Sequence, residues 1–390
     1  MRDVYIAGIG STAFGKYAGE SIESLAVGAA VDALLESTID REQIGALYLG
    51  NFISGPLNGK EVLAGIVADR IGLPNIPCTK VEGACASGGI AFRHACLAVA
   101  TGQVEAAIAV GVETMTHAST KQTTAALNCA MDNENDGPSG LTFPGLFGLA
   151  WRLHEQRYGT SRQQVTSVVR KNKRNGLRNP LAQMGAELSE DEVAASAPIC
   201  DPIQLYDCCP ISDGAAAVVV VSKSLADRIA QHLPHPLIEV LATAQTRGSP
   251  HIGGHADLIS FSATVAAVQR AYEQAGVTAR DIDLVELHDC FSIAEIIDSE
   301  DLGLVPRGQG GFWALEGRTA VDGDIAINAS GGLLAKGHPV GATGIGQIFE
   351  VTRQLRNSHP NQVRDARIGM THNLGGTGVA CTVSILRAVQ

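Results

Sequence analysis

The chain has 390 residues, of which 45% are hydrophobic, 4% aromatic and 18% charged. This length and composition allow one large hydrophobic core or two ordinary ones, and they exclude a disordered or fibrous protein. The net charge of −11 argues against a non-specific nucleic-acid binder, and an anionic ligand would need a local basic patch.

The first predicted element is a strand, because residues 4–9 read VYIAGI. This apolar stretch is too short for the core of a secretory signal sequence. The longest uninterrupted apolar run, AAAVVVV at residues 215–221, is far shorter than a membrane span requires. We therefore expect a cytoplasmic protein with no membrane span and no nucleic-acid partner.

Helix and strand patterns then alternate along the first part of the chain. We expect a helix, a strand, a buried helix and a strand at residues 21–38, 44–51, 85–102 and 105–113. Such alternation is typical of layered α/β proteins in which helices cover the sheets.

The next segment, about residues 116–197, breaks this alternation. It is rich in Asn, Asp, Gly, Pro and Met, and it contains an amphipathic helical pattern at residues 161–180. The strand pattern resumes with DGAAAVVVVSK at residues 213–223. We interpret the segment as a lid or loop domain inserted into the first half of the protein.

The second half repeats the plan of the first. Residues 31–51 and 269–289 each contain a helix end, a polar turn, an isoleucine and a strand, and Ile44 matches Ile282 at an offset of 238. The small-residue turn CASGG at residues 85–89 has a counterpart in GATGIG at residues 341–346. We expect two related halves, residues 1–236 (with the insertion) and 237–390.

The nine cysteines include no Cys-x-x-Cys pair, so no structural zinc site is expected. The HIGGH stretch at residues 251–255 spaces two histidines by four, but the two glycines between them argue against a helical metal-binding face. We expect no metal, and we expect most cysteines to be buried thiols with one or two reactive ones.

Cys85, in GACASGG, stands where a strand pattern ends and a helix pattern begins. The small neighbours would let a thioester approach, and the positive end of the helix dipole would favour ionisation of the thiol. His338, in KGHPVG, lies in a turn that Gly337 and Pro339 make rigid, which suits a base or an oxyanion donor. From the residues alone, either one could instead be an ordinary turn residue.

The stretch ELHDCFS at residues 286–292 places three reactive side chains in a row. If the strand continues through them, His288 and Cys290 point to one face and Asp289 to the other. Cys290 could equally be a buried core thiol. The glycine-rich turn THNLGGTG at residues 371–378 could offer backbone N–H groups to an anion.

Taken together, these motifs resemble the thiolase superfamily, and more narrowly thiolases of the sterol-carrier-protein-2 type. The resemblance spans essentially the whole chain and rests on GACASGG, GVETM, YGTSRQQ…VRKNKRN…NPLAQM, DCCPISDGAAA, ELHDCFS, NASGGLLAKGHPVGATG and HNLGGTG, in this order. It implies two βαβαβαββ halves packed in five α-β-α-β-α layers, with the active site where the halves meet and the inserted domain over coenzyme A.

The resemblance also implies roles for individual residues. Cys85 would be the nucleophile that accepts the acyl group, and His338 would activate it. The second cysteine of most thiolases is replaced here by Asn373, and Cys290 would take over as the acid/base. One oxyanion hole would use His288 and His338, and the other the backbone N–H groups of Cys85 and Gly375.

The implied activity is thiolysis of 3-oxoacyl-CoA, or the reverse Claisen condensation, with acetyl-CoA and coenzyme A as substrates and no permanently bound cofactor. The basic side chains in the amphipathic helix, Arg170, Lys171, Lys173 and Arg174, are candidates for binding coenzyme A, although such a run is most often a solvated helix face. A homodimer or homotetramer is expected. The alternatives are a condensing enzyme or retro-aldolase acting with an OB-fold partner protein, and a non-catalytic lipid carrier.

Overall fold

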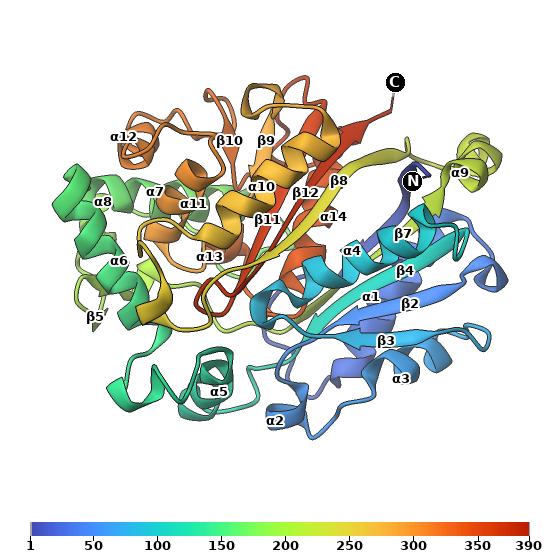
Figure 1. Cartoon of the computed structure of the whole chain (residues 1–390), viewed down its shortest axis with the longest axis horizontal. Coiled ribbons are helices and arrows are strands. Elements are labelled where there is room, and N and C mark those ends of the chain that lie inside the picture. Colours follow the sequence, from blue (N-terminus) through green and yellow to red (C-terminus); the bar gives the residue numbers. More distant parts are fainter. Residues whose placement is uncertain (1, 390) are drawn as a thin grey trace.

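The computed structural model describes residues 2–389 and contains one ten-stranded sheet. The sheet order is β10-β9-β11-β12-β8-β1-β7-β4-β2-β3, so each half of the chain supplies five neighbouring strands (Figure 1). The strands of the first half are β1 (Val4–Ser11), β2 (Ala46–Gly50), β3 (Cys78–Val81), β4 (Ala106–Glu113) and β7 (Gly214–Ser222). Those of the second half are β8 (Ile238–Arg247), β9 (Leu284–Glu286), β10 (Ala326–Ile327), β11 (Ile368–Gly375) and β12 (Ala380–Ala388).

The two halves have the same topology, which confirms the predicted repeat. In the first half β3-β2-β4 are parallel neighbours, and β7 and then β1 add in antiparallel fashion. In the second half β10-β9-β11 are parallel, and β12 and β8 add in the same way. Within the sheet, the halves join through a short antiparallel pairing between β1 and β8.

Helices fill the layers on both sides of each half-sheet. Those of the first half are α1 (Ile22–Ser37), α3 (Leu63–Arg70) and α4 (Ser87–Ala100), and their counterparts in the second half are α10 (Ser262–Ala275), α11 (Ser292–Asp301) and α14 (Thr343–Leu355). Helices α4 and α14 pack against each other in the central layer. The strands are apolar at every position because both of their faces are buried. In β4, Ile108 and Val110 face the outer core that contains α1, whereas Ala107 and Ala109 face the central core.

Glycines allow the first turns of α4 and α14 to meet. A Cβ atom on Gly88 would lie 2.9 Å from the carbonyl oxygen of Gly341, and one on Gly344 would lie 2.2 Å from the backbone nitrogen of Gly89. Because only glycine permits this approach, the two helix N-termini converge at one point between the halves.

The inserted segment forms four helices, α5 (Thr120–Leu127), α6 (Phe143–Tyr158), α7 (Arg162–Arg178) and α8 (Glu190–Ala194), and a small hairpin of β5 (Pro198–Cys200) and β6 (Ile203–Gln204). Helices α6 and α7 pack against α11, α12 (Gly310–Leu315) and α13 (Gly332–Lys336) of the second half (Figure 1). The insertion therefore lies beside the half that carries His288 and His338. The short helices α2 (Ser54–Asn58) and α9 (Lys223–Ile229) complete the structure.

The expected continuation of a strand through His288, Asp289 and Cys290 is wrong. The strand β9 ends at Glu286, and residues 287–290 form an irregular segment before α11.

Among residues 2–389, no helix combines the length and the apolar character needed to cross a bilayer.

Candidate active site

Cys85 lies in a tight turn between β3 and α4. Its neighbour Ala84 has a left-handed backbone, with φ of 51°, which costs energy for a residue other than glycine. The hydroxyl of Ser87 donates to the carbonyl of Ala84 (2.6 Å) and accepts from the N–H of Gly83 (3.0 Å), and these bonds hold the turn in place. The strained, braced turn presents the thiol at a defined position.

His338 follows α13 in a second braced turn. Its backbone N–H donates to the hydroxyl of Ser212 (3.0 Å), and its ring Nδ1 lies 2.7 Å from the hydroxyl of Thr343. The proton of that hydroxyl is directed at the carbonyl of Pro339 (3.1 Å), so the Thr343 oxygen accepts a hydrogen bond from Nδ1–H. This arrangement leaves Nε2 of the neutral ring unprotonated and free to act as a base.

His288 has the opposite arrangement of ring protons. Its Nδ1 lies 3.4 Å from Nδ2 of Asn373, an amide group that can only donate, so Nδ1 accepts and the proton resides on Nε2. Asn373 Nδ2 also donates to the carbonyl of Cys85 (2.9 Å), and Asn373 Oδ1 accepts from the N–H of Gly89 (3.3 Å). His288 therefore presents an N–H donor, where His338 presents an acceptor.

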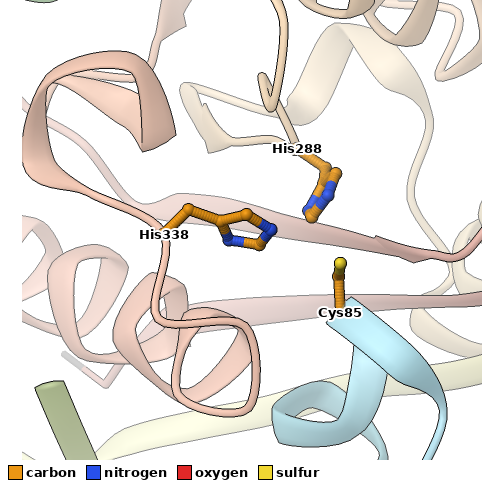
Figure 2. Close-up of side chains that lie close together, drawn as sticks. All are labelled: Cys85, His288 and His338. Atoms are coloured by element: carbon orange, nitrogen blue, oxygen red, sulfur yellow. The ribbon is translucent and has the colours of Figure 1, made fainter. Parts of the chain in front are cut away.

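The three side chains meet where the halves join, and we call Cys85, His288 and His338 the reactive cluster. The sulfur and one ring nitrogen of each histidine all lie within 4.8 Å of one another. The two imidazole rings are 5.0 Å apart between centroids and nearly perpendicular, at 81°, and both point toward the thiol (Figure 2). The cluster thus combines a thiol, a hydrogen-bond acceptor and a hydrogen-bond donor.

Burial keeps all three groups uncharged. It raises the pKa of the Cys85 thiol to about 12, even though the N–H of Gly376 donates to this sulfur and acts in the opposite direction. Burial lowers the pKa of His338 to about 3, and it lowers the pKa of His288 well below its usual range. The helix N-terminus was expected to favour ionisation of Cys85, but removal from water outweighs that effect. The thiol therefore needs a base.

The structure places Asp289 against α13, and Cys290 follows it in the irregular segment before α11. Asp289 is fully buried and accepts hydrogen bonds from the N–H groups of Leu333 (2.7 Å) and Leu334 (3.3 Å) at the start of α13, and from Asn172 (2.8 Å). Its role is to hold the helix that leads into the His338 turn. Cys290 is partly buried, and its pKa is raised well above the usual value, first by removal from water and then by the proximity of Cys209 and Cys85, whose thiolates would repel a thiolate on Cys290.

Gly375 lies at the end of β11, close against the Cys85 turn. A Cβ atom there would lie 2.2 Å from the carbonyl oxygen of Gly83 and 3.0 Å from the nitrogen of Ala86. Glycine is therefore required at this position for the turn to approach β11. The N–H that is directed at the Cys85 sulfur belongs to the next residue, Gly376, which the sequence did not single out.

The basic side chains of α7 divide into two pairs. Lys171 is mostly buried, 2.8 Å from Glu295, and Lys173 is 2% exposed and donates to the carbonyl of Leu334 (2.6 Å). Arg170 and Arg174 are accessible and pair with Glu190 and Glu187, respectively. The two lysines are thus engaged in holding α7 on the second half, and the two arginines remain the accessible cations among the four.

Glu113, in the GVETM motif, lies beneath the cluster and had no predicted role. It is fully buried, and its carboxylate accepts from the N–H groups of Phe52 (2.9 Å) and Gly341 (3.2 Å) and from the amide of Asn51 (2.7 Å). Burial raises its pKa to about 7. It connects the segment after β2 to the His338 turn.

The reactive cluster has the donor types of a zinc site, namely one thiol and two neutral imidazoles. The hydrogen bond from Nδ1–H of His338 to Thr343 orients that ring as the partner of a zinc ligand does, whereas His288 would first have to lose the proton from Nε2. The thiol and His338 could therefore take up a thiophilic ion.

Comparison with known proteins shows two family matches, "Thiolase, N-terminal domain" over residues 4–224 and "Thiolase C-terminal domain-like" over residues 244–388. The acetyl-CoA acetyltransferase of Methanothermobacter thermautotrophicus is 42% identical over 99% of both chains. Sterol carrier protein 2 of Homo sapiens is 32% identical over 98% of this chain and 72% of its own length. Among solved structures, the Ltp2-ChsH2(DUF35) aldolase superposes with a TM-score of 0.83 at 25% identity, covering 99% of this chain and 98% of that one.

Proposed function

Because this chain belongs to the thiolase family, we propose that it transfers acyl groups between coenzyme A and its own Cys85, with the reactive cluster as the catalytic centre. It is a coenzyme-A-dependent thiolase and hence an acyltransferase. The observation that supports the assignment of roles is the pairing of one partly buried thiol, which removal from water keeps protonated, with two neutral imidazoles of opposite tautomer.

In the degradative direction, the first step is attack of Cys85 on the 3-oxo carbon of a 3-oxoacyl-CoA. Nε2 of His338 takes the thiol proton as the C–S bond forms, since the thiol is protonated at rest. The bond between the second and third carbons then breaks, which leaves an acyl-cysteine and the enolate of acetyl-CoA. The enolate oxygen is stabilised by Nε2–H of His288 together with the newly formed imidazolium of His338.

Cys290 completes the first half-reaction by giving its proton to the enolate carbon, which forms acetyl-CoA and leaves a thiolate. Coenzyme A then attacks the acyl-cysteine and gives its own proton to that thiolate. His338 returns its proton to Cys85 as the C–S bond breaks. The backbone N–H groups of Cys85 and Gly375 are proposed to hold the oxyanion on the acyl carbon, next to the Gly376 N–H that contacts the thiol. In the condensing direction Cys290 removes the proton instead.

Coenzyme A is proposed to bind as a substrate over the inserted domain, with its phosphates near Arg170 and Arg174. No resident cofactor or metal is required by the steps above. Acyl-CoA thioesters of fatty-acid or lipid metabolism are the proposed substrates, in the cytoplasm. A homodimer or homotetramer is the proposed assembly.

The test is thiolysis of acetoacetyl-CoA and of longer 3-oxoacyl-CoA thioesters by the purified chain, in comparison with Cys85→Ala, Cys290→Ala and a matched control, Cys96→Ala. Cys96 lies within α4, the helix that follows Cys85, and is buried in the central core. We expect no turnover in Cys85→Ala, normal acylation without carbon–carbon cleavage in Cys290→Ala, and near-normal turnover in Cys96→Ala. Full turnover in Cys85→Ala would refute the assignment.

A second function, retro-aldol cleavage with a partner protein, is favoured by the likeness to the Ltp2-ChsH2(DUF35) aldolase. It predicts that the chain alone is inactive in thiolysis and gains carbon–carbon lyase activity when its partner protein is added. A non-catalytic lipid carrier would leave Cys85 unlabelled after incubation with radiolabelled acetyl-CoA.

A further inference from the structure

A third thiol lies directly opposite Cys290. The backbone N–H of Cys209 donates to the carbonyl of Cys290 (3.1 Å), and the adjacent residues Cys208 and Phe291 form an antiparallel bridge. Residues that oppose each other in an antiparallel pair project to the same side, with Cβ atoms roughly 4.5–5.5 Å apart. The side chains of Cys209 and Cys290 are therefore neighbours, whereas Cys208 projects to the other side.

The acidic groups around Cys290 would oppose the formation of a thiolate there if they were ionised. Asp289, Asp298 and Cys85 all raise the pKa of Cys290 when they are charged, and so does Cys209. Burial also raises the pKa of Cys209 well above its usual value, so Cys209 keeps its proton. A protonated thiol beside Cys290 can donate a hydrogen bond to it.

A buried cation, Lys173, lies near Cys209. Lys173 is 2% exposed, and its ammonium group donates to the carbonyl of Leu334 (2.6 Å). Burial lowers the pKa of Lys173 to about 8. A negative charge on Cys209 would raise this pKa, so the two groups lie within electrostatic reach of each other.

We propose that Cys209 is a positioning residue for Cys290: its S–H donates to the Cys290 sulfur when that sulfur is a thiolate, and the Lys173 ammonium lies near Cys209. This inference rests on the proposed function of Cys290 as the acid/base. In the cleavage direction the Cys290 S–H bond breaks and a C–H bond forms on acetyl-CoA. The Cys209 proton stays on its own sulfur, and the thiol proton of coenzyme A later restores Cys290, so protons balance over the cycle.

The test separates proton transfer from acylation. Exchange of the acetyl hydrogens of acetyl-CoA with deuterium from D2O reports on Cys290, and acetylation of Cys85 reports on the nucleophile. A hydrogen bond to a charged group stabilises more than one between neutral groups, but a thiol is a weak donor. We therefore expect Cys209→Ala to slow the exchange by roughly tenfold. The pH at which exchange reaches half its maximum should rise by about one unit.

The controls are Cys209→Ser, which keeps a donor and should restore most of the exchange, and Cys208→Ala, which removes the adjacent thiol on the other side and should leave exchange unchanged. Cys85 acetylation should be normal in all three variants, and thermal unfolding verifies that each is folded. Exchange at the wild-type rate and pH in Cys209→Ala would overturn the inference, as would equal losses in Cys208→Ala or a parallel loss of acetylation. Persistent exchange in Cys290→Ala would instead overturn the role of Cys290 itself, and this inference with it.

Discussion

Replacement of Thr343 by valine tests how the protein prepares its base. The substitution conserves shape but removes the hydroxyl that accepts a hydrogen bond from Nδ1–H of His338 (2.7 Å). A buried donor without a partner costs about 1–3 kcal/mol, so the proton should move to Nε2, where it blocks transfer from Cys85. The fraction of competent enzyme would then fall between roughly fivefold and 150-fold, because 1.36 kcal/mol corresponds to a factor of ten.

The assay is the rate at which Cys85 is acetylated by acetyl-CoA or alkylated by iodoacetamide, measured against pH. Thr343→Ser keeps the hydroxyl and should react as the wild type does. Thr352→Val is the matched control, because Thr352 is buried on the same helix and its hydroxyl meets no protein partner among residues 2–389. An unchanged rate in Thr343→Val, or an equal loss in Thr343→Ser, would refute the assignment of the His338 tautomer.

Three further predictions concern the surroundings of the reactive cluster. Because the pKa of Glu113 is raised to about 7 in the folded protein, its stabilising contribution is complete below about pH 4.5 and is lost as the pH rises through about 7. In the wild type, this group should therefore make the free energy of unfolding roughly 3 kcal/mol larger at pH 4.5 than above pH 7. Glu113→Gln should abolish that difference, as measured by urea unfolding across this pH range. Zn²⁺ should inhibit thiolysis reversibly by binding to the reactive cluster, and EDTA should restore activity. Mg²⁺ prefers oxygen ligands and should have no effect. Thiolysis that is insensitive to Zn²⁺ would contradict the proposed geometry of the cluster. Arg174→Glu should raise the KM for acetyl-CoA with little change in kcat. Lys171→Met should leave this KM unchanged. It should instead lower the free energy of unfolding by about 3–5 kcal/mol, because it leaves the buried carboxylate of Glu295 without its cationic partner. The opposite pattern in this last pair would place the phosphate-binding cation at Lys171.

Much of the fold could be predicted because it depends on local patterns. The offset of 238 between Ile44 and Ile282 corresponds to equivalent positions before β2 and β9 in the structure. Apolar periodicity and turn residues carry this information along the chain, and they do not require knowledge of distant contacts. The end of β9 could not be predicted in this way. The mixture of apolar and polar residues in LVELHDC is compatible both with a continuing strand and with an extended irregular segment.

The candidate site was only partly accessible to sequence reasoning. Cys85 and His338 stood out because small residues, glycines and a proline surround them, and the structure brings both into one cluster with His288. The basic residues of α7 were misleading as a group, because a helix pattern reveals which residues are charged but not which of them the neighbouring half will bury. Lys171 and Lys173 are engaged with internal partners for this reason.

The sequence by itself determined the repeated α/β plan and the family, since both depend on residue types at fixed spacings. Only the tertiary structure decided the protonation of the site. The tautomers of His338 and His288 depend on Thr343 and Asn373, and the neutral resting state of Cys85 depends on burial between the two halves. Hydrogen-bond partners and removal from water are properties of the packed molecule, because residues far apart in the chain create them together.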